Sequence, residues 1–445
     1  MVSKQELALV MENIENAAKS EMVCIVGVGF VGLTLGMSLC KVGKNVLGWE
    51  KDIQTSKALS EGKTEISEPG LSKLLFDFTK LGNFKMISDA KDASIARVFI
   101  ITVGTPLREG RINLDYITEA TLQILPALKD GDLIIIRSTT AVGTCREVVL
   151  PILEASGKKF RLAMCPERTV EGSALSEMSS LPQIIGSLNS ESFKAAKEFF
   201  DLLGPEVVEV SSLEAAELTK LINNTYRDLM FGYANEIASI SNAYGISARE
   251  VITAANHNYP RSNIALPGLS GGPCLEKDPW ILVETGNRVG LSMGISKASR
   301  EINEETLSIF LKSHLRKGQE FSKISILGLA FKGLPETRDL RGSYIFPLVD
   351  YLNDYFPGSD LHGYEPSGIE TIVNLDLKIH TNLDSCLSDS ELIIVLTNSL
   401  AFNNISFQVS TLSDANCLIL DFWSRNTAMN FLDGQKYISW SGRVK

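Results

Sequence analysis

Short apolar runs that stop at turn residues and give way to helical patterns recur through the first part of the chain. We expect strands at residues 22–26, 45–49, 97–103 and 133–136, with helix-like stretches between them. Short strands that alternate with helices are typical of a parallel sheet covered on both faces. The first part of the chain is therefore predicted to be a doubly wound α/β domain.

The pattern changes at residue 213. Residues 213–244 contain no proline and only one internal glycine, Gly232, and apolar side chains such as Leu218, Ile222 and Leu229 recur at helical spacing. A helix of this length usually bridges domains or builds a subunit interface. From residue 322 the strand–turn–helix order returns, with strands expected at 324–327, 360–363, 391–396 and 417–421, which predicts a second α/β domain.

The composition is that of an ordinary globular protein. The chain has 445 residues, of which 44% are hydrophobic and 22% charged, enough for two or three domains. The net charge of −10 argues against a nucleic-acid partner or an anionic membrane surface. Residues 1–20 lack a long apolar core, so we expect neither a signal peptide nor a membrane span. Their apolar positions have helical spacing and predict a short amphipathic helix.

The cysteines and histidines give no sign of a disulfide framework or a metal centre. Seven cysteines are present, an odd number, and no two of them form a CxxC pair. This usage suits free thiols in a reducing cytoplasm. The four histidines are scattered along the chain, so no metal site is expected.

A glycine-rich turn follows the first expected strand, where the run GVGFVG begins at Gly27 and opens a helix. Gly27 permits a tight turn, Gly29 lets the backbone approach a pyrophosphate, and Gly32 allows close packing of helix on strand. Glu50 ends the next strand, where a carboxylate accepts hydrogen bonds from both ribose hydroxyls and repels a 2′-phosphate. The pattern favours NAD over NADP, and the alternative is a glycine-rich turn without a ligand.

One thiol lies in an unusual loop. Residues 268–279 read GLSGGPCLEKDP, in which glycines can bring backbone N–H groups close to a developing charge. Cys274 is near Lys277 and Asp278, and a neighbouring cation favours the reactive thiolate form of a cysteine. A free cysteine is more often buried and inert, which is the alternative reading.

The expected long helix carries a polar stripe, because Glu217, Lys220, Asn224 and Arg227 follow one another at spacings of three and four. The stripe is either a solvated charged face or a polar face turned toward a buried site, and the pattern by itself favours the solvated face.

Two further segments have charged groups at expected strand ends. The run CPER at residues 165–168 would present Glu167 and Arg168 at the edge of a sheet, unless it is a surface loop. Lys332, Arg338 and Arg341 follow the strand expected at 324–327, where basic groups can hold phosphates, although isolated basic residues on surface loops are common.

Together these motifs resemble the UDP-glucose/GDP-mannose dehydrogenase family over nearly the whole chain after the first twenty residues. The motifs that carry the resemblance are GVGFVG at Gly27, VGTP at Val103, RSTTAVGT at Arg137, CPER at Cys165, ELTKLINNTYRD at Glu217, GGPCLEKDP at Gly271 and GLAFKGLPETRDLRGS at Gly328. Seven motifs in this order are far more specific than any one of them.

The resemblance implies two Rossmann-like doubly wound domains joined by a long central helix and a helical dimerisation domain. We expect an N-terminal helical extension at 1–21, an NAD-binding domain at 22–210, a central dimerisation domain with the cysteine loop at 211–318, and a UDP-sugar-binding domain at 319–445. A homodimer through the central helix, a UDP-sugar substrate and a cytoplasmic location follow, with no nucleic-acid or membrane partner.

The resemblance also implies a four-electron oxidation that uses two NAD per sugar and passes through a thiohemiacetal and a thioester on Cys274. Lys220 matches the family lysine that stabilises oxyanion charge, and Asn224 looks like its companion. Asp278 matches the aspartate beside the nucleophile. Thr139 and Glu167 match residues credited with ordering the catalytic water or aiding hydrolysis.

The ligand-binding residues follow in the same way. The resemblance assigns the cofactor to Gly27, Gly29, Phe30, Val31, Gly32, Glu50, Thr105, Thr139 and Arg341, with Arg338 as a rival to Arg341. It assigns the nucleotide sugar to Glu167, Arg168, Lys220, Asn224, Arg261, Gly271, Lys332 and Arg425, with Arg261 reaching the sugar of the other subunit. The run DFWSR at 421–425 stands where the family usually has a small-arginine-asparagine motif, so the motif does not identify the residues that recognise the base.

The sugar is indicated by the residues after Glu167. The forms CPERTVEG at 165–172 and LPQIIG at 181–186 are more similar to members that act on UDP-N-acetylhexosamines. UDP-N-acetylmannosamine is the first expectation and UDP-N-acetylglucosamine the second, and Arg168 could offer donors to an N-acetyl carbonyl. The alternatives are UDP-glucose or GDP-mannose as substrate, a single-step NAD dehydrogenase without covalent catalysis, and a protein that senses NAD or nucleotide sugar without turnover.

Overall fold

The computed structural model describes residues 22–424 and 431–442, and the chain divides into two compact units, Met1–Ile222 and Asn223–Lys445. The helix predicted near the N-terminus lies outside the described residues. The units are called the first unit and the second unit below.

The first unit contains an eight-stranded sheet with the order β10-β9-β8-β7-β4-β1-β2-β3. Its strands are β1 (Met22–Val26), β2 (Val46–Trp49), β3 (Phe84–Ile87), β4 (Ala96–Ile101), β7 (Asp132–Ile136), β8 (Phe160–Met164), β9 (Gln183–Ser187) and β10 (Val207–Val210). The strands from β3 to β8 in this order run parallel, whereas β9 pairs antiparallel with β8. The predicted parallel sheet is confirmed, and β9 and β10 extend it in the opposite direction.

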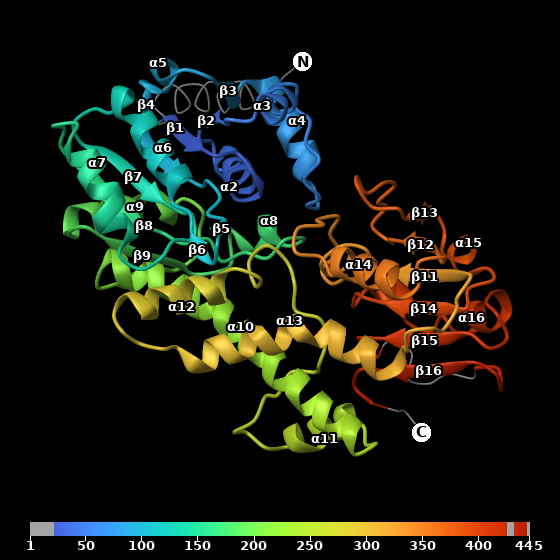
Figure 1. Cartoon of the computed structure of the whole chain (residues 1–445). Coiled ribbons are helices and arrows are strands. Elements are labelled where there is room, and N and C mark those ends of the chain that lie inside the picture. Colours follow the sequence, from blue (N-terminus) through green and yellow to red (C-terminus); the bar gives the residue numbers. More distant parts are fainter. Residues whose placement is uncertain (1–21, 425–430, 443–445) are drawn as a thin grey trace. The chain divides into compact units, whose positions relative to one another are not determined.

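Helices cover both faces of this sheet, as Figure 1 shows for the blue and green part of the chain. They are α2 (Phe30–Lys41), α3 (Ile53–Ser60), α4 (Leu71–Leu81), α5 (Ala90–Ala93), α6 (Asp115–Ile124), η1 (Leu125–Ala127), η2 (Cys145–Val149), α7 (Leu150–Glu154), α8 (Ala174–Glu177) and α9 (Ser190–Asp201). A short hairpin, β5 (Leu107–Arg108) and β6 (Arg111–Ile112), lies between β4 and α6.

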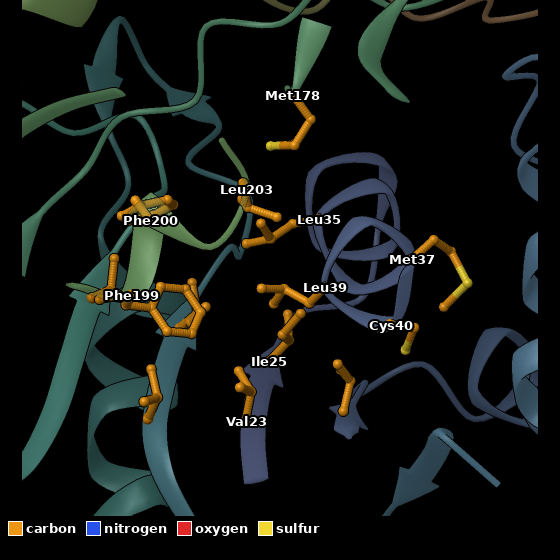
Figure 2. Close-up of a cluster of buried hydrophobic side chains, with 14 of the residues drawn as sticks. Val23, Ile25, Leu35, Met37, Leu39, Cys40, Met178, Phe199, Phe200 and Leu203 are labelled. Atoms are coloured by element: carbon orange, nitrogen blue, oxygen red, sulfur yellow. The ribbon is translucent and has the colours of Figure 1, made fainter. Parts of the chain in front are cut away.

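Successive residues of β1 point into two separate hydrophobic clusters, because side chains alternate along a strand. Ile25 belongs to the cluster under α2, α4 and α9, and Val26 belongs to the cluster under α6 and α7. Figure 2 shows Leu39 of α2 directed toward Ile25 and Phe199 of α9, and Leu35 of the same helix directed toward Leu203. Both faces of the sheet are thus buried, as the continuous apolar runs predicted.

The strand ends of the first unit are in register. Val26 pairs with Ile101, Ile101 with Ile136, and Ile136 with Met164. The residues that follow β1, β4, β7 and β8 therefore lie in one row at the carboxyl edge of the sheet, where open α/β sheets bind ligands.

The second unit contains a six-stranded sheet with the order β13-β12-β11-β14-β15-β16, and all its pairs are parallel. Its strands are β11 (Lys323–Leu327), β12 (Asp360–Tyr364), β13 (Lys378–His380), β14 (Leu392–Val395), β15 (Leu418–Asp421) and β16 (Lys436–Ser439). Its later helices are α14 (Ile345–Tyr355), α15 (Leu383–Leu387), η3 (Leu400–Phe402) and α16 (Ser406–Leu412). The second predicted α/β domain is confirmed (Figure 1, orange and red).

The long helix is also confirmed. Helix α10 (Leu213–Ala243) has 31 residues and is followed by α11 (Ala248–Asn256), α12 (Asp278–Arg288) and α13 (Gly294–His314). The boundary between the two units falls within α10, after Ile222. The helix therefore contributes side chains to both units.

The close packing of α2 on its neighbouring turn depends on a glycine. We expect Gly32→Ala to lower stability by about 1–3 kcal/mol, because the added Cβ would lie 2.2 Å from Gly27 O and 2.7 Å from Thr102 Oγ1. The matched control is Gly36→Ala on the same helix, where the nearest atom, Ile25 Cδ1, would be 3.4 Å away. Urea-unfolding midpoints measure both variants, and equal midpoints would contradict the packing argument.

Candidate active site

The turn after β1 has the geometry of a dinucleotide-binding turn. Gly27 has a φ of +87°, and an added Cβ would lie 2.8 Å from Val103 Cγ1. Gly29 begins α2, and a Cβ there would meet no atom within 4 Å. Within the described residues, α2 has neither a side-chain N-cap nor an acidic residue in its first turn. The N-terminus of α2 thus suits an approaching pyrophosphate.

The acidic residue predicted to bind ribose is fixed beside this turn. Glu50 follows β2, and its Oε2 accepts a hydrogen bond of 2.8 Å from the Val28 N–H. Its Oε1 accepts one of 3.1 Å from the Asp52 N–H. Gly27, Gly29, Gly32 and Glu50 therefore fit an NAD molecule at the carboxyl edge of the sheet.

Two threonines border the same edge. Thr105 Oγ1, in the segment after β4, donates to Thr139 O at 2.6 Å, in the segment after β7. Nearby, Ser138 Oγ donates to Val103 O at 2.7 Å. These bonds fix the two segments to each other, so Thr105 and Thr139 come together as the cofactor assignment requires.

A buried ion pair forms at the next two strand ends. Arg137, directly after β7, donates from Nη2 and Nε to Glu167 Oε2 at 2.7 and 2.9 Å. The other carboxylate oxygen accepts from the N–H groups of Arg168 and Thr169 at 2.7 and 2.8 Å. Glu167, in the segment after β8, is thus held by four donors.

This environment keeps Glu167 ionised. Burial alone would raise the pKa of its carboxyl group, but the charge of Arg137 and the hydrogen bonds outweigh burial and lower the pKa below the usual value. The charge of Lys220 on α10 acts in the same direction. The structure therefore brings Glu167 and Lys220 into one electrostatic environment.

Arg168 is half-buried, and its Nη2 donates to Pro182 O. This contact joins CPER to the segment before β9, so the two stretches that indicated an N-acetylhexosamine lie together in the first unit. CPER is consequently part of the sheet edge rather than a detached surface loop.

The polar stripe on α10 is mostly buried. Glu217, Lys220 and Asn224 have exposed fractions of 0%, 8% and 6%, whereas Arg227 is exposed. The solvated-face interpretation, which the pattern alone favoured, is wrong for these three residues. Both oxygens of Glu217 accept backbone hydrogen bonds, from the Gly143 N–H at 2.6 Å and the Cys145 N–H at 2.7 Å.

The thiol loop, residues 268–277, lies in the second unit. All seven cysteines fall within the described residues and are free, and Cys274 is exposed while the other six are buried. Burial raises the pKa of Cys165 and Cys24 to about 12. Cys274 is therefore the thiol best placed to meet a ligand.

Asp278 supports this loop from the start of α12. Its side chain is fully buried and accepts from Asn224 Nδ2 at 2.5 Å and from Lys277 Nζ at 2.7 Å. Its N–H donates to Cys274 O at 2.9 Å. The structure thus brings Asn224, Asp278 and the cysteine turn together, and it places the ammonium of Lys277 on Asp278.

Glycines allow the loop to pack tightly. An added Cβ at Gly271 would lie 2.5 Å from Gly342 O, and one at Gly272 would lie 2.4 Å from the Phe331 ring. The Gly272 N–H also donates to Gly342 O at 3.0 Å. The thiol loop and the segment after β11 are therefore in direct contact.

The basic residues after β11 are arranged separately. The Leu329 and Ala330 N–H groups donate to Glu365 Oε2 at 2.7 and 3.0 Å, which fixes the turn before Lys332. Arg341 forms an ion pair with Asp339 at 2.5 Å, and Arg338 Nε donates to Ser367 O at 2.5 Å. These arginines bind different partners, so their competing cofactor assignment stays a prediction.

Two predicted substrate residues remain, Arg261 and Arg425. Arg261 is exposed, and its guanidinium lies 4.6 Å from the centre of the Tyr259 ring. Arg425 lies outside the described residues. Both assignments stay predictions.

Three buried charged residues, Arg137, Asp228 and Arg300, received no role from the sequence. Arg137 and Asp228 appeared only as the first and last letters of two motifs, and Arg300 was not considered. Asp228 lies four residues after Asn224 and so continues the polar stripe of α10, a signal that was available. The partner of Asp228 is Arg300 on α13, 72 residues further along the chain, so sequence spacing gave no sign of this contact.

Two features are absent from the part of the chain that the structure describes. Within residues 22–424 and 431–442, no helix is long and apolar enough to span a membrane. In the same residues, no three His, Cys, Asp or Glu side chains gather where they could hold a metal ion.

The chain matches one protein family along most of its length. Residues 21–203 match the NAD binding domain of the UDP-glucose/GDP-mannose dehydrogenase family, residues 214–305 its central domain, and residues 325–426 its UDP binding domain. A UDP-N-acetyl-D-mannosamine dehydrogenase from Methanococcus maripaludis is 32% identical over 398 residues, which cover 86% of this chain and 87% of that protein.

Solved structures agree with this match. The UDP-N-acetylmannosamine dehydrogenase of Pyrococcus horikoshii superposes with a TM-score of 0.82 at 25% identity, covering 94% of this chain and 99% of that one. The enzyme of the same name from Staphylococcus aureus gives a TM-score of 0.79 at 28% identity, covering 95% and 98%. The chain therefore belongs to the UDP-glucose/GDP-mannose dehydrogenase family, as an oxidoreductase that carries the family's NAD binding, central and UDP binding domains in that order.

Proposed function

We propose that this protein oxidises the C6 hydroxymethyl group of a UDP-N-acetylhexosamine to a carboxylate. UDP-N-acetylmannosamine is the first candidate and UDP-N-acetylglucosamine the second. The names of the similar proteins support this choice, as does the contact of Arg168 with the segment before β9. The observation that carries the chemistry is the single exposed cysteine, Cys274, in a loop next to buried Asp278.

The cofactor part of the proposal follows the turn after β1. NAD⁺, when bound, accepts one hydride in each of the two oxidations. The backbone from Gly29 through Phe30 and Val31 to Gly32 would hold its pyrophosphate, and Glu50 its ribose. Thr105 and Thr139 border the same edge, and Arg341 reaches the pyrophosphate with Arg338 as its rival.

The covalent route divides a difficult oxidation into easier steps. The alcohol loses a hydride and a proton to become an aldehyde, and Cys274 Sγ then adds to its carbon to give a thiohemiacetal. Loss of a second hydride and of the hydroxyl proton leaves a thioester, which water cleaves to release the acid and the free thiol. Lys220 and Asn224, one helical turn apart on α10, would stabilise the oxyanions formed.

Asp278 and Thr139 are proposed to help order the water that cleaves the thioester. Glu167 is proposed to support this step by holding the segment after β8 in place, because four donors already bind its carboxylate. For the substrate, Lys332 would contact the phosphates, Gly271 and Arg168 the sugar, Arg425 the nucleotide, and Arg261 the sugar of a second subunit.

The domain limits and the location belong to the same proposal. The family matches support boundaries at 22–210, 211–318 and 319–445, with 1–21 as an extension. Free thiols throughout the chain suit a cytoplasmic location.

A homodimer through α10 is proposed from one exposed stripe. Five apolar side chains of this helix are between 39% and 61% exposed, namely Leu218, Ile222, Tyr226, Tyr233 and Ile240. At about 100° per residue, these positions fall within an arc of roughly 80°. A row of exposed aromatic and aliphatic side chains on one face suits an isologous contact with a second copy.

The substrate assignment predicts a clear order of turnover. Purified protein with NAD⁺ should oxidise UDP-N-acetylmannosamine fastest, UDP-N-acetylglucosamine more slowly, and UDP-glucose and GDP-mannose least. Each sugar oxidised should yield two NADH and one uronic acid, measured by absorbance and mass spectrometry. Faster turnover of UDP-glucose than of either acetamido sugar would contradict the substrate, and one NADH per sugar would contradict the four-electron reaction.

The covalent route predicts that Cys274→Ala abolishes acid formation. We expect a loss of at least roughly a thousandfold in uronic acid production, because removing a nucleophile removes the step that forms the thioester. Cys40→Ala, which removes a buried thiol elsewhere, is the control and should stay active. Normal acid production by Cys274→Ala would instead favour the route without covalent catalysis.

The dimer proposal predicts that charge on the α10 stripe separates the subunits. Tyr226→Glu with Tyr233→Glu should weaken association by roughly a thousandfold, because two aromatic anchors at an interface contribute about 2 kcal/mol each. Sedimentation analysis would measure the mass. Phe407→Glu, at an aromatic that is 75% exposed on α16, is the control and should leave the dimer intact. A wild-type monomer would refute the proposal.

A further inference from the structure

The thiol loop has no helix or strand of its own between Gly268 and Glu276, so other side chains must fix it. Asn235 of α10 holds the first residue, since its Nδ2 donates to Gly268 O and its Oδ1 accepts from the Gly268 N–H, both at 3.0 Å. The part that carries Cys274 needs a separate anchor.

That anchor is a buried ion pair between two helices. Arg300 of α13 and Asp228 of α10 have exposed fractions of 2% and 0%, and Arg300 Nη1 donates to Asp228 Oδ1 at 2.6 Å. Asn303 Nδ2 donates to the same oxygen at 2.9 Å and Ser270 Oγ at 3.3 Å. Asp228 is therefore satisfied from three sides, as a buried carboxylate must be.

Two nitrogen atoms of the Arg300 guanidinium also donate to backbone carbonyls of the thiol loop. Nη1 also donates to Leu275 O at 2.9 Å, and Nη2 donates to Ser270 O at 3.2 Å. These two carbonyls stand on either side of Cys274 in the sequence. One planar guanidinium thus spans the turn that presents the thiol, and Asp228 fixes the orientation of that guanidinium.

We propose that Arg300 is a positioning residue for Cys274, acting through the carbonyls of Ser270 and Leu275 and touching no reacting atom. This inference rests on the proposed function in so far as Cys274 is the nucleophile. An exposed thiol on a glycine-rich loop would otherwise sample many orientations, and misplacing a reacting group by about 1 Å can cost roughly a hundredfold in rate. The guanidinium confines the loop without covering the sulfur.

The side chain of Arg300 also has a contact that does not involve the loop. Its Nε lies 3.4 Å from Glu304 Oε1, and the Glu304 side chain is 46% exposed. Because the Glu304 carboxylate is open to solvent, which screens its charge, this contact contributes little to stability. Glu304→Gln therefore removes charge from the same guanidinium without loosening the loop, and it serves as the matched control.

The test compares Arg300→Lys with Glu304→Gln in the full-length protein. Lysine keeps a positive charge near Asp228, but one ammonium cannot reproduce the fork that reaches both carbonyls. In Arg300→Lys, amide hydrogen exchange in the peptide containing Cys274 should quicken by roughly tenfold or more. The kcat should fall by about tenfold to a hundredfold, with the KM for the UDP sugar changed by less than about threefold. Glu304→Gln should match the wild type in all three.

Each outcome decides a separate point. Unchanged exchange around Cys274 in Arg300→Lys would overturn the positioning role, as would faster exchange throughout the second unit with a matching fall in melting temperature. If Cys274→Ala still forms acid, the proposed covalent route fails, but local exchange still tests whether Arg300 holds the thiol loop.

If Arg300→Lys does not fold, Tyr344→Phe replaces it. This change removes a hydroxyl that donates to Ser270 O at 3.3 Å and to Asn303 O at 3.0 Å. Tyr344→Phe should also quicken amide exchange around Cys274 and lower kcat, but by less than Arg300→Lys. No shift in either would refute the inference.

Discussion

A helix that buries a row of polar side chains must give each of them a partner, and this constraint on α10 organises the chemistry of the protein. Glu217, Asn224, Asp228 and Asn235 recur along one side of the helix, and each holds a loop or another helix through hydrogen bonds. A buried polar group without a partner would cost about 1–3 kcal/mol, so these contacts are obligatory once the helix is packed. The loops that carry Thr139 and Cys274 thereby acquire fixed positions within their own units.

The two α/β sheets use the same device at their first strand. Gly27 and Gly328 both have a φ of +87°, and each N–H donates to the last residue of the neighbouring strand, Trp49 or Tyr364. In each sheet the glutamate that follows, Glu50 or Glu365, accepts from backbone N–H groups of the turn. The same turn geometry thus arises twice from sequences that share little beyond their order of elements.

The sequence predicted those parts of the fold whose hydrophobic pattern is continuous. The central strands β1, β4, β7, β11 and β14 are buried on both faces, and all were expected within a few residues of their observed limits. The strands β3, β10, β13 and β16 were not anticipated, because they are short and lie at or near the sheet edges, where the burial pattern is broken. Sequence also gave no warning that β9 reverses direction, since pairing direction is a property of the tertiary fold.

The candidate site likewise contains residues that the sequence identified and features that it did not. Gly27, Glu50 and Cys274 stood out because their types are unusual at their positions. The sequence did not predict that the polar stripe of α10 is buried, because charged residues at helical spacing are more often solvated. Lys277 lies three residues after Cys274, and its ammonium pairs with the adjacent Asp278, so the cation expected to act on the thiol is held by a carboxylate instead.

Glu167 shows how burial can separate a chemical role from a positional one. A general base must exchange a proton, and its pKa should lie near the working pH. Arg137 and two backbone N–H groups instead stabilise the charged form of Glu167, so its pKa is lowered and its four acceptor interactions are already made. A carboxylate in this state is a poor proton acceptor but a strong anchor for the segment that follows β8. Glu167 therefore holds Arg168 and Thr169 in place and balances the charge of Lys220.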